Sequence, residues 1–199
     1  MSNIQGKFPN TRLRRNRMKE FSRRLVAENN LSTDDLILPL FVCEGNNVED
    51  PIKSMPGVSR YSIDKLLNKV EEAVRFSIPA IAIFPQIEPS LKNAEGSLAY
   101  DEKNLVCRSI KNIKKEFSGI GIICDVALDP FTDHGHDGLV INDKIDNDKT
   151  LDILEKQALV QVHAGCDVIA PSDMMDGRVG RIRTVLDSND FQDKLILSY

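Results

Sequence analysis

The stretch GIGIICDVA, residues 119–127, decides the fold of this chain. Its apolar run is too continuous for a strand with one face in water, and such runs are typical of parallel sheets covered on both sides. The run also contains an aspartate, Asp125, which is costly to bury without a partner. The stretch therefore predicts a buried parallel strand with a polar group at its carboxyl end.

The same pattern repeats on both sides of this strand. Further apolar runs of strand length occur at 36–42, 78–84, 166–170 and 194–199, and segments with apolar residues three or four apart predict helices at 63–76, 102–117, 148–165 and 180–188. We expect Ser62 and Asp148 to cap two of these helices and Gly165 to end one. This alternation predicts an α/β fold, either an open doubly wound sheet or a (β/α)8 barrel. No glycine-rich phosphate motif follows a strand, so the nucleotide-binding version lacks its signature. A (β/α)8 TIM barrel at this spacing would need about three more units, so in that case the chain would hold about the first five β/α units.

The loop that follows the central strand, DVALDPFTDHGHDG at 125–138, concentrates polar groups. Its aspartates recur every four residues, but Pro130 and Gly135 exclude a helix. Asp125 is either a catalytic carboxylate at a strand end or the cap of an Asx-turn. The HGH triplet is a weak zinc signal, and the carboxylates would suit a hard cation such as Mg²⁺ better. Ser172 follows the next strand, which favours one shared site at the carboxyl ends of two strands, although it could instead cap a helix.

Charge and composition exclude several classes of protein. The net charge is −4, so the overall charge does not indicate binding to nucleic acid or to an anionic membrane. No apolar run approaches the roughly 20 residues that span a bilayer. The N-terminus lacks the apolar region of a secretory signal. The four cysteines form no CxxC pair, which predicts buried, reduced thiols in a cytoplasmic protein.

Six segments carry a resemblance to a known family. They are TRLRRNR, LILPLFVCEG, PIKSMPGVSRYSID, DVALDPFTDHGHDG, VIAPSDMMDGRVGRIR and LDSNDFQDKLILSY. In this order they resemble the delta-aminolevulinic acid dehydratase (porphobilinogen synthase) family over nearly the whole chain. The resemblance implies an N-terminal arm and first helix at 1–34 and a partial barrel at 35–199. It implies a lyase that condenses two 5-aminolevulinate molecules to porphobilinogen in tetrapyrrole (haem) synthesis, working as a homo-octamer whose arm contacts a neighbouring subunit.

The resemblance also assigns roles to residues. It makes Asp125 an active-site acid/base and places Asp129, Asp137 and Ser172 at the substrate. Zinc-dependent members carry three cysteines where this chain has Ala127, Asp129 and Asp137, which makes active-site Zn²⁺ unexpected. The chain is similar to the aspartate-rich, magnesium-responsive branch. An allosteric Mg²⁺ would then have its ligand outside this chain, while Asp129 and Asp137 could hold a hard cation weakly.

The family's two Schiff-base lysines have no counterpart in residues 1–199. We therefore expect the chain alone to be inactive. Two alternatives stay open: the chain is an inactive product or a subunit-interaction remnant, or, without the resemblance, it belongs to a Mg²⁺-dependent barrel lyase or aldolase.

Overall fold

The structure, a computed structural model, describes residues 6–199. It divides after Ser32 into two compact units. The first contains a 3₁₀ helix, η1 (Leu13–Arg17), and a short α-helix, α1 (Glu20–Leu25), neither of which buries a residue. No helix within residues 6–199 is long and apolar enough to cross a bilayer.

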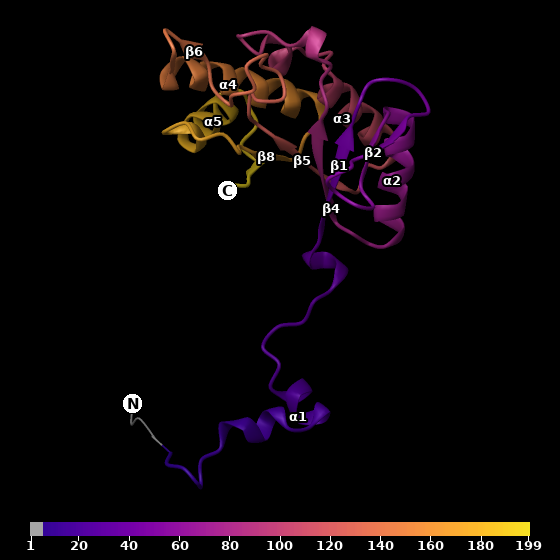
Figure 1. Cartoon of the computed structure of the whole chain (residues 1–199), viewed down its shortest axis with the longest axis vertical. Coiled ribbons are helices and arrows are strands. Elements are labelled where there is room, and N and C mark those ends of the chain that lie inside the picture. Colours follow the sequence, from indigo (N-terminus) through magenta and orange to yellow (C-terminus); the bar gives the residue numbers. More distant parts are fainter. Residues whose placement is uncertain (1–5) are drawn as a thin grey trace. The chain divides into compact units, whose positions relative to one another are not determined.

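The second unit is built on a seven-stranded sheet with the order β2-β3-β1-β4-β5-β8-β9 (Figure 1). From β3 to β9 all neighbours pair in parallel, and β2 is antiparallel to β3. The strands are β1 (Ile37–Val42), β2 (Glu49–Pro51), β3 (Ser59–Tyr61), β4 (Ala80–Pro85), β5 (Gly121–Asp125), β8 (Val168–Ala170) and β9 (Leu195–Ile196). The helices that follow β3, β4, β5 and β8 are α2 (Ile63–Arg75), α3 (Leu105–Glu116), α4 (Asn147–Ala164) and α5 (Arg178–Asp187). This repeat is the first part of a β/α barrel, as the sequence predicts.

The two faces of the sheet are packed differently. One face is covered by the four helices, and Ile81, Ile122 and Ile169 belong to the main core between sheet and helices. Successive side chains of a strand alternate between faces, so Ala82, Ile123 and Ala170 form a small separate cluster on the other face. All four cysteines are buried and free, as predicted.

Several boundaries differ from those predicted. The cap of α4 is Asp146, whose Oδ1 accepts a hydrogen bond from the N–H of Lys149 (3.0 Å), and not Asp148. Ser62 does occupy the N-cap position of α2, but its hydroxyl bonds Asp64 and Val48 and caps no helical N–H. Gly165 is left-handed (φ 115°) and ends α4 as expected. Helix α5 begins at Arg178, two residues before the helix predicted at 180–188.

Short elements missing from the sequence prediction complete the fold. They are the strands β2 and β3, the hairpin of β6 (Val140–Ile141) and β7 (Lys144–Ile145), and the 3₁₀ helices η2 (Thr33–Asp35), η3 (Pro89–Leu91) and η4 (Ser97–Tyr100). Each is at most four residues long, so neither a helical nor an alternating period can be recognised in it.

Candidate functional site

Asp125 ends β5 and meets Ser172 from the loop after β8. The hydroxyl of Ser172 donates a 2.5 Å hydrogen bond to Oδ1 of Asp125. Because β5 and β8 are adjacent and parallel, the two loops leave the sheet at the same edge. The structure thus brings together two of the predicted site residues.

A second bond joins the same two loops further from the sheet. Oδ2 of Asp137 accepts a hydrogen bond from the N–H of Met174 (3.0 Å). Asn147, at the start of α4, adds a third link: its Oδ1 accepts from the N–H of Asp176 (2.8 Å). The loops after β5 and β8 therefore form one connected surface.

Burial sets the proton affinity of Asp125. Desolvation raises its pKa to about 6; the hydrogen bond from Ser172 opposes this, and the charges of Asp129 and Asp173 add to it. A carboxyl group with a pKa near 6 can both accept and release a proton near neutral pH. Asp125 has the environment that proton transfer requires.

Asp129 lies close to the same centre. Its side chain is exposed, yet partial desolvation raises its pKa, with a further rise from the charge of Asp137 and a decrease from that of Lys92. The predicted residues 125, 129 and 137 thus contribute negative charge to one region. Such a region attracts an ammonium group.

Asp173 is a member of this site to which the sequence assigned no role. Its side chain is fully buried, Oδ1 accepts from the N–H of Met175 (2.8 Å), and Oδ2 lies 3.5 Å from Nε of Arg178. Desolvation raises its pKa, and Arg178 opposes that rise. The signal available in the sequence was an aspartate directly after Ser172 with an arginine five residues on.

The two histidines of the loop stabilise it from within. His134 Nδ1 accepts from the N–H of His136 (3.1 Å), and the His136 carbonyl accepts from the hydroxyl of Thr132 (2.8 Å). Nδ1 of His136 also lies 2.7 Å from Oδ1 of Asp137. Within residues 6–199, no three His, Cys, Asp or Glu side chains are grouped so as to hold a metal ion.

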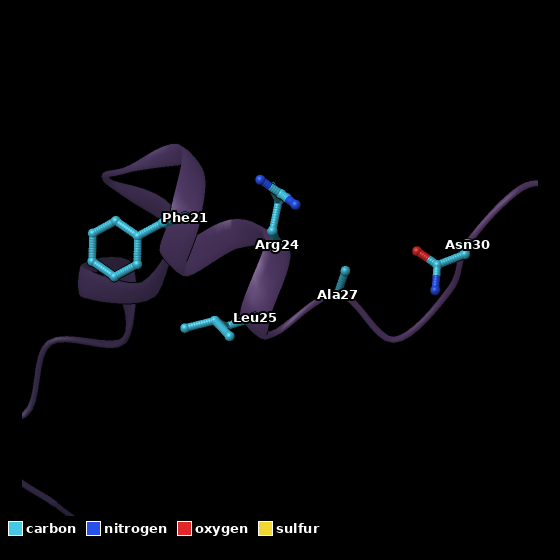
Figure 2. Close-up of a pocket in the computed structure, with 5 residues that line it drawn as sticks. All are labelled: Phe21, Arg24, Leu25, Ala27 and Asn30. Atoms are coloured by element: carbon cyan, nitrogen blue, oxygen red, sulfur yellow. The ribbon is translucent and has the colours of Figure 1, made fainter.

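A separate hollow of about 560 Å³ lies on the N-terminal unit (Figure 2). It is lined by Phe21, Arg24 and Leu25 of α1 and by Ala27 and Asn30 of the segment that follows. Phe21 is 62% and Leu25 80% exposed. With no carboxylate and little enclosure, this hollow is no candidate for the chemistry.

Comparison with known proteins identifies the family of this chain. The family model described as delta-aminolevulinic acid dehydratase matches residues 10–199. A delta-aminolevulinic acid dehydratase of Bradyrhizobium diazoefficiens is 56% identical over 188 residues, which are 94% of this chain and 53% of that protein. One from Ruminiclostridium josui is 42% identical and is covered over 91% of its length.

A solved structure shows the same fold. The crystal structure of delta-aminolevulinic acid dehydratase (porphobilinogen synthase) from Toxoplasma gondii ME49, in complex with the reaction product porphobilinogen, matches with a TM-score of 0.92 and 43% identity. The match covers 95% of this chain and 54% of that one. The chain spans about half the length of this structure and of the first curated relatives. From residue 10 to residue 199, this chain belongs to the delta-aminolevulinic acid dehydratase family.

Proposed function

We propose that this chain supplies one half of an active site that condenses two molecules of 5-aminolevulinate to porphobilinogen with loss of water. The observation that carries the proposal is the hydrogen bond between Asp125 and Ser172 at the carboxyl ends of two barrel strands. In barrel enzymes this face is where catalytic groups lie. The pKa of Asp125, about 6, suits a general acid/base in such a condensation.

Each predicted residue has a role consistent with its environment. Asp125 exchanges protons with the bound substrate, and Ser172 fixes the carboxylate of Asp125 by its hydrogen bond. Asp129 and Asp137 add negative charge around the substrate ammonium group. The Schiff-base lysines, which need a lowered pKa to attack a ketone, are supplied by chain outside residues 1–199.

The donor chemistry does not fit a zinc site like that of the cysteine-containing branch. Ala127 offers no ligand at one of the three positions, and the carboxylates of Asp129 and Asp137 are hard oxygen donors. We derive no step that uses Zn²⁺. Mg²⁺ is proposed only as an allosteric ion whose ligand lies outside this chain.

The proposal is tested by joining residues 1–199 to the second half of the Bradyrhizobium relative. We expect the joined polypeptide to form porphobilinogen and to give a borohydride-trapped adduct with 5-aminolevulinate. The 199-residue chain alone should give neither. Porphobilinogen formed by the 199-residue chain alone would contradict the proposal that this chain supplies only half of the active site. A joined polypeptide that folds but is inactive would favour the alternative, that the chain is an inactive interaction remnant. Full activity of the joined form in chelator would exclude a required metal.

We further propose that the N-terminal unit mediates homo-oligomer formation. Its apolar side chains Leu13, Met18, Phe21 and Leu25 are between 62% and 85% exposed, and exposed apolar groups of this density are typical of interaction surfaces. The arginines beside them carry the basic charge of the segment.

Deleting residues 1–32 should reduce self-association without unfolding the barrel unit, because the two units are compact by themselves. Sedimentation of the joined polypeptide with and without these residues measures the change. Replacing only Phe21 and Leu25 with serine should have a smaller effect in the same direction. An unchanged number of subunits per particle after the deletion would contradict the role of the N-terminal unit.

A further inference from the structure

Two buried glutamines of α4 contact the main chain of the site loop. Nε2 of Gln161 donates a 2.9 Å hydrogen bond to the carbonyl of Asp125, and Nε2 of Gln157 donates to the carbonyl of Ala127 (3.2 Å). Each glutamine is only 1% exposed. They are four residues apart and so lie on one face of the helix, the face that also buries Leu154 and Ala158.

The sheet itself leaves the carbonyl of Asp125 without a donor. In a parallel ladder, alternate residues of a strand direct their peptide groups to the same neighbour. Gly121 donates to the carbonyl of Pro79, so Ile123 and Asp125 face β4 as well. The register, which pairs Ile83 with Cys124, then places Pro85 where the donor for Asp125 should be.

Proline has no N–H, so β4 cannot complete this ladder. A buried carbonyl without a donor destabilises the folded state. Gln161 removes this cost at the residue whose side chain faces Ser172. Gln157 does the same two residues further along, where the chain has left the sheet.

The glutamines are not accounted for by packing alone. The Oε1 atom of each is buried and has no hydrogen-bond partner among residues 6–199. An apolar side chain of similar size would fill the same space without burying that oxygen. What the amides add is a donor for each loop carbonyl.

We propose that Gln157 and Gln161 are positioning residues, which hold the main chain from Asp125 to Ala127 so that the Asp125 carboxylate stays against Ser172. Both side chains are buried and act through the main chain of the loop. Their consequence for catalysis rests on the proposed function, but their effect on the loop does not, and it can be measured without substrate.

The test is amide hydrogen exchange in the 199-residue chain. In Gln161→Met, exchange at Val126, whose N–H is bonded to the carbonyl of Ala170, should accelerate about tenfold or more, because the loss of the bond leaves a buried acceptor. Gly121, at the other end of β5, should change much less. The matched control is Gln192→Met, since Gln192 is exposed and also donates to a carbonyl, that of Asp187 (2.9 Å); it should leave Val126 unchanged.

Gln161→Glu is the conservative rescue. Burial favours its neutral form, which still carries an O–H donor, so at pH 5 its exchange at Val126 should stay within about twofold of the parent. Equal acceleration at Gly121 and Val126 in Gln161→Met, or a Gln161→Glu variant no better protected than Gln161→Met, would overturn the proposal. Because no step uses 5-aminolevulinate, such a result would leave the proposed function intact.

Discussion

Replacing Asp125 with asparagine should stabilise the folded chain by roughly 2–3 kcal/mol at pH 8. In the folded protein, burial raises the pKa of this carboxyl group to about 6, whereas an aspartate in an unfolded chain has a pKa of about 3.9. Each pKa unit corresponds to about 1.4 kcal/mol. Asparagine removes the buried charge and keeps an oxygen that can accept the hydrogen bond from Ser172.

Because the pKa of Asp125 is higher in the folded than in the unfolded chain, the stabilisation by Asp125→Asn depends on pH. Between about pH 4 and pH 6 the folded state holds a proton on Asp125 that the unfolded state has released, so stability falls as the pH rises through this window. The gain from Asp125→Asn should therefore be nearly absent at pH 4 and complete above about pH 6. Urea unfolding of both proteins across this range measures it.

Asp146→Asn provides the control for that series. The pKa of Asp146 is lowered by the hydrogen bond from the backbone of Lys149, so removing its charge should not raise stability at pH 8. A gain from Asp125→Asn that is equal at pH 4 and pH 8 would contradict burial of the charge as its cause.

The Asp125→Asn substitution should also greatly reduce catalytic turnover. In the joined polypeptide we expect Asp125→Asn to lower turnover by about 10²–10⁴-fold, the usual contribution of a positioned acid/base. A variant that is more stable but inactive is the expected trade between stability and function. A fully active variant would refute the catalytic role of Asp125 and leave the electrostatic account of its stability unaffected.

The neighbourhood of Asp125 and Ser172 was predictable from sequence, but their bond was not. An aspartate ending one apolar run and a serine following the next predict adjacent polar groups, because neighbouring parallel strands end at one edge. The 2.5 Å contact depends on the path of the loop at 171–177. That path is fixed by contacts with Asp137 and Asn147, far away in sequence.

Buried polar residues were the main gap in the prediction. Asp173 is fully buried beside Arg178, although charged side chains are usually exposed. Gln157 and Gln161 resemble surface residues of a helix until the buried stripe of α4 is known. The need for Gln161 arises from Pro85 on another strand, which no local pattern reveals.

The start of α4 shows a different limit. Asp146 and Asp148 are equally good capping residues, and the helical period of the sequence does not separate them. The hairpin of β6 and β7 ends at Ile145 and leaves Asp146 as the last extended residue. The hairpin that precedes α4 therefore determines that Asp146, and not Asp148, caps the helix.

Replacing Phe131 with alanine should destabilise the chain by about 3–5 kcal/mol, the usual cost of emptying a buried aromatic site. Phe131 lies in the loop after β5 but is only 2% exposed and belongs to the main core. Its N–H donates to the carbonyl of Leu128 (2.8 Å), and its carbonyl accepts from the N–H of Asn93 in the loop after β4 (3.3 Å). The ring thus fixes the loop that carries Asp129 to the body of the barrel.

Urea unfolding of Phe131→Ala, Phe131→Leu and Phe76→Ala tests this role. Phe76 is 59% exposed, so its replacement should cost less than about 1 kcal/mol. Phe131→Leu keeps most of the apolar volume and should lie between the two, which gives a measurable value even if Phe131→Ala fails to fold. Equal effects at Phe131 and Phe76 would show that the loop is held by its hydrogen bonds alone. The expected order would instead show that the loop carrying Asp129 is anchored by a core side chain.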